Sequence, residues 1–189
     1  MANVNSAEWW NSMAGRYQER GDLRERPDEY AEAASHLVGG PVLELGCAFG
    51  QFSKYVPSDI SYIGMDISSE LIKRARKLHP DKLFVCANGA KLGSKQWGKA
   101  FAHVCCFQML EHFTWEDFTA LMQNVAGLAQ VSLLFSVPRG LPSRADAKAD
   151  GHLIGWRDEE DLEKCFKQFG ESVEFMPCAA NHLMGQLYY

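Results

Sequence analysis

The sequence has 189 residues, of which 47% are hydrophobic and 23% charged, as is ordinary for a globular protein of one domain with a substantial core. Its formal net charge of −5 argues against a protein that grips long nucleic acid through its phosphates. No stretch approaches the roughly 18 uncharged apolar residues of a membrane span, and the N-terminus lacks the basic start and apolar core of a secretory signal. We therefore expect a cytoplasmic protein without nucleic-acid or membrane partners.

Two amphipathic helices are predicted before residue 41. The first spans Ser6 to Arg20 and places apolar side chains at helical spacing, namely Trp10, Met13, Ala14 and Tyr17. The second begins at Pro27, which suits the first turn of a helix, and ends at Gly39-Gly40. We expect residues 1–40 to form a helical cap on residues 41–189, within a single domain.

From residue 41 onward, strands alternate with helices five times before a final strand pair. After the opening strand, the predicted strands are 60–65, 82–86, 101–107, 131–137, 173–176 and 183–189. Ser68 or Ser69 can cap the helix after the second strand, and Thr114 the helix after the fourth. This order predicts an α/β fold with a doubly wound, mostly parallel seven-stranded sheet and helices on both faces.

The segment from Pro41 to Val56 is typical of a strand that turns sharply into a helix. An apolar run breaks off at Gly46, and Gly50 follows four residues later. Such a turn brings backbone N–H groups to one point, where they can hold part of a small polar ligand. Asp66, at the end of the second strand, offers two carboxylate oxygens to a ribose, although an aspartate that merely caps the next helix is the alternative.

The six cysteines contain no C-x₂-C pair and mostly lie in apolar runs. Buried thiols that behave as small hydrophobic groups explain them better than a disulfide or a metal site. We therefore predict no metal. The glycine spacing also departs from the G-x-G-x-x-G of dinucleotide-binding proteins.

Five segments together resemble the class I, Rossmann-like S-adenosylmethionine-dependent methyltransferases of the small-molecule type. Val42 to Gly50 resembles their first motif, V-L-E-L-G-C-G-x-G. The others are Tyr62 to Ser68, Phe84 to Leu92, Met109 to Phe113 with its L-E-H segment after the fourth strand, and Gly151-His152-Leu153. The resemblance covers about residues 41 to 189 and implies S-adenosyl-L-methionine as cofactor and S-adenosyl-L-homocysteine as product.

The resemblance also implies roles for particular residues. Glu44 would hold the methionine ammonium group, and Asp66 the ribose. The remaining cofactor-binding residues would be Gly46, Cys47, Ala48 and Gly50 along the methionine chain, Ile67, Asn88 and Gly89 around adenine, and Phe107 and Gln108 beside the sulfonium. Core packing is the alternative for Ile67 and Phe107.

Two positions depart from the family pattern. Ala48 replaces the usual middle glycine, so the loop must accept a Cβ close to the ligand. Asn88 replaces the commoner aspartate, but its side-chain carbonyl can still accept a hydrogen bond from the adenine amino group. These departures leave open a cofactor-binding or scaffold subunit that does not catalyse.

Methyl transfer mainly requires the donor and the acceptor to be held in line in a dry pocket. His112 is the leading candidate for a general base, and His152 a weaker one, with a structural histidine as the alternative. Trp9, Trp10, Met13 and Tyr17 are candidates for a lid over cofactor and acceptor, or a simple packing stripe.

Absent features narrow the acceptor. The [D/N]-P-P-[Y/F] motif of exocyclic-amine methylases is replaced by Phe107 to Leu110, and the carboxylate cluster of catechol-type enzymes is missing. We therefore expect transfer to oxygen or nitrogen of a small-molecule acceptor. A catalytically silent subunit and a nicotinamide-dependent oxidoreductase are the alternatives. The oligomeric state is left open.

Overall fold

The computed structural model describes residues 6–19, 26–92, 98–142 and 151–189, with side chains of residues 16–19 outside that description. Seven strands form one sheet in the order β3-β2-β1-β4-β5-β7-β6. They are β1 (Val42–Leu45), β2 (Tyr62–Asp66), β3 (Leu83–Cys86), β4 (Phe101–Phe107), β5 (Ala129–Pro138), β6 (Ser172–Phe175) and β7 (His182–Tyr188).

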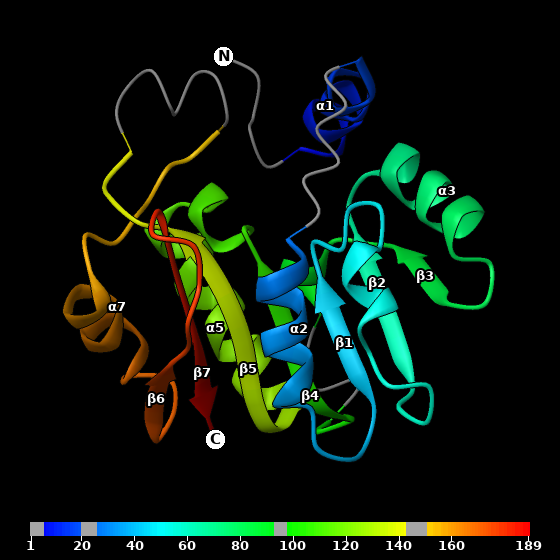
Figure 1. Cartoon of the computed structure of the whole chain (residues 1–189). Helices are drawn as coiled ribbons and strands as arrows, with labels where there is room; N and C mark the ends of the chain where they lie inside the picture. The colour runs from blue at the N-terminus through cyan, green and yellow to red at the C-terminus, as the bar shows by residue number, and fades with distance from the viewer. Residues whose placement is uncertain (1–5, 20–25, 93–97, 143–150) are drawn as a thin grey trace.

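The first five strands pair in parallel, and β7 runs antiparallel to both β5 and β6. The carboxyl ends of β1, β2 and β4 therefore lie at one edge, together with the beginning of β7 (Figure 1). The predicted α/β fold with a mostly parallel seven-stranded sheet is confirmed.

The helices are α1 (Ala7–Glu19), α2 (Pro27–Ser35), α3 (Ser69–Leu78), α5 (Trp115–Leu128) and α7 (Glu159–Phe166), with 3₁₀ turns η1 (Gln51–Lys54), η2 (Gly89–Lys91) and η3 (Leu110–His112). Three polar side chains cap helices as N-cap acceptors: Ser68 for α3, Thr114 for α5 and Asp158 for α7. None of the described helices is long and apolar enough to cross a membrane.

Two helices differ from the prediction. The helix expected after Gly50 is only the four-residue 3₁₀ turn η1. Helix α2 ends at Ser35, before Gly39-Gly40, because the backbone of Val38 turns to meet the side chain of His103. After α2, a tertiary contact therefore accompanies the early end of the helix.

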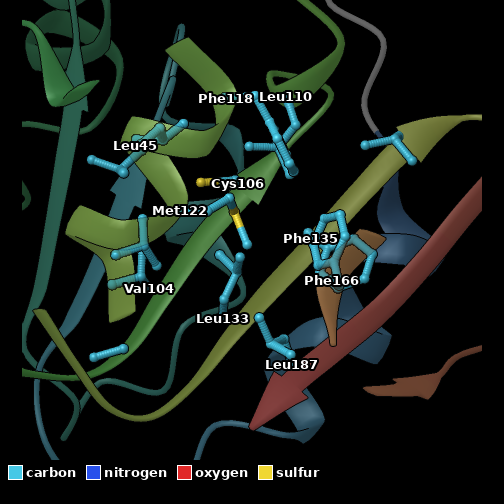
Figure 2. Close-up of a cluster of buried hydrophobic side chains, with 14 of the residues drawn as sticks. Leu45, Val104, Cys106, Leu110, Phe118, Met122, Leu133, Phe135, Phe166 and Leu187 are labelled. Atoms are coloured by element: carbon cyan, nitrogen blue, oxygen red, sulfur yellow. The ribbon is translucent and has the colours of Figure 1, made fainter. Parts of the chain in front are cut away.

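The core consists of two main clusters. Successive residues along a strand belong alternately to one cluster and to the other. One joins Val104, Cys106, Leu133 and Phe135 to α5 and α7, and Figure 2 shows Phe118, Met122 and Phe166 in it. The other joins Cys105, Phe107 and Leu134 to α2 and α3. Because side chains alternate along a strand, both clusters contact the sheet through the same strands.

A buried polar network links the segment after α2 with β4, β5 and β7. His103 Nδ1 lies 2.8 Å from Ser132 Oγ, and its Nε2 lies 3.1 Å from Val38 N. Gln186 Nε2 donates to the same serine oxygen at 2.8 Å. Burial lowers the pKa of His103, so the ring is neutral and can accept one hydrogen bond while it donates another.

We predict that His103→Ala lowers the free energy of unfolding by about 2–4 kcal/mol, since it leaves a cavity and takes a partner from the buried Ser132. Urea denaturation measures the change. His36→Ala is the control, because His36 lies at the surface beside Glu32 at 3.3 Å, and it should change stability by less than about 0.5 kcal/mol. Equal losses in the two variants would contradict the prediction.

Candidate active site

A cavity of about 900 Å³ opens at the carboxyl ends of β1, β2 and β4. It brings together nearly all the residues predicted for the site, namely Trp10, Met13, Glu44, Gly46, Cys47, Ala48, Asp66, Ile67, Asn88, Gly89, Phe107, Gln108, His112 and His152. Helix α1 lies beyond the carboxyl end of β1 in Figure 1 and contributes to the lining. Such an edge is where doubly wound folds bind their ligands.

Three predicted residues lie elsewhere or are not described. Gly50 does not line the cavity; a Cβ there would lie 2.5 Å from the ring of Phe84, so its small size serves packing. Trp9 packs edge-on against Trp10 at 4.6 Å and does not line the cavity either. The side chain of Tyr17 lies outside the described residues.

Asp66 holds the turn after β1 to the beginning of α3. Its Oδ2 accepts the Ala48 N–H at 3.0 Å, and its Oδ1 accepts the Ser68 N–H at 2.8 Å. Burial raises the pKa of this carboxyl, although the backbone N–H groups act in the opposite direction. The two carboxylate oxygens have four lone pairs in all, and the Ile67 N–H also contributes a hydrogen bond, so the carboxylate keeps acceptor capacity for a ligand hydroxyl in the cavity.

The turn after β1 offers fewer backbone donors than its sequence indicates. The N–H groups of Gly46 and Cys47 both donate to Met65 O, and that of Gly50 donates to Cys47 O. The Ala48 N–H is bound by Asp66. The expected converging set of free N–H groups is therefore wrong at these four positions, because the turn uses them for its own shape.

Two glycines that line the cavity, Gly46 and Gly89, allow its walls to pack closely. Gly46 has a φ of +71°, and a Cβ there would lie 2.9 Å from Met109 Sδ. Gly89 is similarly confined, since its Cβ would lie 2.9 Å from Leu45 Cδ2. Glycine at these two positions therefore lets the walls of the cavity pack closely.

Ala48 adopts a left-handed backbone with a φ of +46°. This conformation is unfavourable for any residue with a Cβ. The side chain packs against a small apolar cluster of Ala14, Phe49 and Leu71, which includes part of α1. The departure from glycine that the sequence shows thus places a strained residue between the turn and α1.

Glu44 is buried on β1 and accepts a short hydrogen bond from the hydroxyl of Tyr62. The ring of Tyr62 fits there because Gly64 has no side chain; a Cβ would lie 2.7 Å from the tyrosine oxygen. Burial raises the pKa of Glu44 to about 8, and the nearby Asp66 carboxylate adds to the shift. Glu44 is therefore mostly protonated at neutral pH while no cation lies beside it.

Asn88 and Gln108 both make structural contacts while they line the cavity. Asn88 Oδ1 accepts the Ala90 N–H at 3.0 Å and so caps η2, leaving one lone pair for a ligand. Gln108 has a φ of +51°, and its amide Nε2 donates to Ser136 Oγ at 3.2 Å. It therefore fixes the end of β4 against β5.

His112 is buried and held in one tautomer. Its Nδ1 lies 3.3 Å from Gly151 O and must donate to it, which leaves the lone pair on Nε2. Burial, with the nearby His152, lowers the pKa of His112 to about 3, so the ring is neutral. Trp10 and His152 both contact the ring edge-on, at centroid distances of 4.8 and 5.0 Å.

Arg26, Glu29 and His182 form a cluster that the sequence patterns did not reveal. Arg26 Nη1 lies 3.7 Å from Glu29 Oε2, and Glu29 also forms a short hydrogen bond with His182 Nδ1. Arg26 and His182 line the cavity. Since they come from opposite ends of the chain, no local pattern could place them together.

We predict that Ala48→Gly raises the free energy of unfolding by up to about 1 kcal/mol, because the left-handed backbone costs alanine more than glycine. Ala31→Gly is the matched control in a regular part of α2, where Ala31 is exposed, and it should lose about 1 kcal/mol. Chemical denaturation compares the two. A loss in Ala48→Gly as large as that of Ala31→Gly would contradict the strain.

Known proteins resemble this chain in part of its sequence and in its fold. Residues 42–130 match the family model of a methyltransferase domain. No curated protein sequence matches the chain.

Solved structures share the fold at low sequence identity. Magnesium protoporphyrin IX methyltransferase from Synechocystis PCC 6803, with bound S-adenosylhomocysteine, is 22% identical, with a TM-score of 0.63 over 82% of this chain and 76% of that one. An S-adenosylmethionine-dependent methyltransferase from Clostridium acetobutylicum is 11% identical, with a TM-score of 0.70 over 95% and 98%.

A protein described as a zinc-dependent alcohol dehydrogenase from Rhodobacter sphaeroides is 14% identical, with a TM-score of 0.76 over 98% of both chains. At these identities the structural neighbours show the fold alone. The family match goes further, because residues 42–130 include the motifs that line the cavity at the ends of β1, β2 and β4. Residues 42–130 thus match a methyltransferase domain, and the chain shares its fold with solved S-adenosylmethionine-dependent methyltransferases.

Proposed function

We propose that this protein transfers a methyl group from S-adenosylmethionine to an oxygen or nitrogen atom of a small-molecule acceptor. The observation that supports it most is a cavity lined both by the Asp66 carboxylate and by the buried, neutral His112. Residues 1–189 form one domain in this proposal. Residues 1–40 serve as its cap, and helices lie on both faces of the sheet.

The residues present fit the cofactor. Asp66 has spare lone pairs for the two ribose hydroxyls, Ile67 covers adenine, and Asn88 with Gly89 faces the adenine edge. Gly46, Cys47 and Ala48 follow the methionine chain. When bound, the cofactor supplies a methyl group already activated by a positive sulfonium sulfur.

Two charged groups suit the two ends of the amino acid part. Glu44, once ionised, neutralises the ammonium group, and Arg26 is the cation on the cavity wall that suits the carboxylate. Arg26 Nη1 is buried and has no hydrogen-bond partner among the described residues. A ligand carboxylate would give it one.

The acceptor side is formed by Trp10, Met13, His112 and His152. His112 Nε2 accepts a hydrogen bond from the acceptor hydroxyl and so directs an oxygen lone pair at the reacting centre, because Nδ1 is already committed to Gly151 O. Trp10 and Met13 exclude water from this contact. A pKa of about 3 makes His112 a positioning group rather than a strong base at neutral pH.

Asp66→Ala should weaken binding of S-adenosylhomocysteine by at least about tenfold, since two hydrogen bonds to a charged group disappear. Transfer of labelled methyl to a mixture of small hydroxyl and amine compounds should fall with it. Asp81→Ala removes an exposed aspartate before β3 and is the matched control.

Thermal unfolding of both variants separates lost binding from lost folding. Calorimetric titration gives the dissociation constant, with NADH as a competing ligand. Equal affinity of wild type and Asp66→Ala for S-adenosylhomocysteine, or binding of NADH alone, would sink the cofactor assignment. Label found only on macromolecules would sink the small-molecule acceptor.

Glu44 should release a proton when S-adenosylhomocysteine binds at pH 7. Its pKa of about 8 in the free protein leaves it mostly protonated, and the ligand ammonium favours the carboxylate. If Glu44 ionises fully in the complex, about 0.9 proton leaves per molecule bound. Because the ionised form of Glu44 binds the ligand better, its titration should tighten S-adenosylhomocysteine binding as the pH rises from 6 toward 8.

Titration calorimetry in buffers of different ionisation enthalpy measures this proton. Glu44→Gln is the control, since glutamine keeps the shape and one oxygen acceptor for Tyr62 but cannot ionise. The buffer dependence should shrink in that variant. An identical dependence in both proteins would show that another group releases the proton.

A further inference from the structure

Three side chains that can bind a metal ion converge beyond the end of β4. Glu111 and His112 come from η3, and His152 comes from the segment before α7. One potential ligand atom from each lies within 4.8 Å of the other two. Glu111 Oε1 lies 3.8 Å from His112 Nε2. Two atoms bound to the same zinc ion lie about 3.4 Å apart in tetrahedral geometry, so small rotations would close the set.

The surrounding backbone holds these three side chains in place. His112 Nδ1 donates to Gly151 O, which is the arrangement that directs the Nε2 lone pair of a histidine toward a metal. Leu153 N and Ile154 N both donate to Glu111 O, at 2.7 and 3.2 Å. The segment that carries His152 is therefore attached directly to the backbone of Glu111.

A second observation points to a missing cation. The side chain of Glu111 is only 2% exposed, and its Oε2 is buried without a hydrogen-bond partner in the described part of the chain. Burial of a carboxyl oxygen without a partner is unfavourable, whether the carboxyl group is ionised or protonated. A metal ion would satisfy this oxygen.

The three residues are also accessible from an open space. All three line the large cavity, and Glu111 and His152 also line a neighbouring cavity of about 230 Å³ bounded by Pro138, Arg139 and Asn181. An ion can therefore enter, and an additional ligand can reach it from the cavity. Entry and a free coordination position are features of catalytic rather than structural metal sites.

We propose that Glu111, His112 and His152 bind one divalent transition-metal ion of the zinc type, with an open position toward the cavity. Two imidazoles and one carboxylate suit zinc or iron better than magnesium or calcium, which prefer oxygen ligands alone. This proposal departs from the expectation of no metal. That expectation considered cysteine pairs and carboxylate clusters, whereas these ligands come from segments far apart in the sequence.

The ion would act in the proposed methyl transfer, and this role rests on that function. It uses the same Nε2 lone pair that otherwise meets the acceptor, so with the ion present His112 positions the acceptor oxygen through the metal. Binding of the ion itself requires neither cofactor nor acceptor, and it can be tested alone.

The test uses the full chain after removal of metals with a chelator. Titration calorimetry with Zn²⁺ should show one site, and both His152→Ala and Glu111→Gln should weaken it by about 10- to 100-fold or more. His36→Ala removes a surface histidine beside Glu32 and should leave the affinity unchanged. Because Glu111→Gln keeps the side-chain shape, we expect it to fold. A thermal unfolding curve like that of wild type checks this.

Absorption spectra with Co²⁺ identify the ligand atoms. Nitrogen and oxygen ligands support the site, whereas a thiolate charge-transfer band would assign the metal to cysteines and overturn it. Wild-type affinity in His152→Ala and Glu111→Gln would also overturn it. Wild-type protein that binds S-adenosylhomocysteine but no Zn²⁺ would refute the metal site and leave the proposed methyl transfer standing.

Discussion

The carboxylate of Asp66 accepts backbone N–H groups from both sides of the gap between β1 and α3. Its bond to Ala48 shapes the turn, and its bond to Ser68 places the N-cap of α3. The hydroxyl of Ser68 donates to Asn11 Oδ1 at 2.7 Å, so α1 is attached to the same point. The turn, α3 and α1 are thus connected through the buried Asp66 carboxylate and its neighbour Ser68.

The cavity gathers buried acids at some cost to the free protein. Glu44, Asp66 and Glu111 all have a raised pKa, and burial is the largest cause in each. A core of apolar residues would avoid that cost, so the retention of three carboxyls around one cavity is more easily explained by ligands than by folding. Positive groups are the ligands that such a cavity favours.

Local patterns were sufficient for the strands, the caps at Ser68 and Thr114, and the position of Asp66 at the end of β2. They rely on residues close in sequence, where periodicity and capping act. They were insufficient where a contact joins distant segments. The Gly46, Cys47 and Gly50 N–H groups turned out to be used internally.

Other features depend on the tertiary fold in the same way. Val38 and His103 meet only in the tertiary fold, and His182 meets Glu29 only because β7 begins beside α2. The sequence showed that alanine replaces the usual glycine at position 48. Only the structure shows that Ala48 has a left-handed backbone conformation. Local sequence patterns therefore place the strands and helix caps better than the contacts between distant segments.

The reversed direction of β7 has a consequence for how such a protein can change in evolution. Because β7 begins where the parallel strands end, Asn181 and His182 join residues of α1 and His152 on the cavity wall. All of these lie outside residues 42–130, which match the methyltransferase family model. In the proposed function, exchange of these outer segments would change part of the acceptor side, while the strands within residues 42–130 stay unaltered. Chimeras joined near residues 41 and 130 are the natural units for redesigning it.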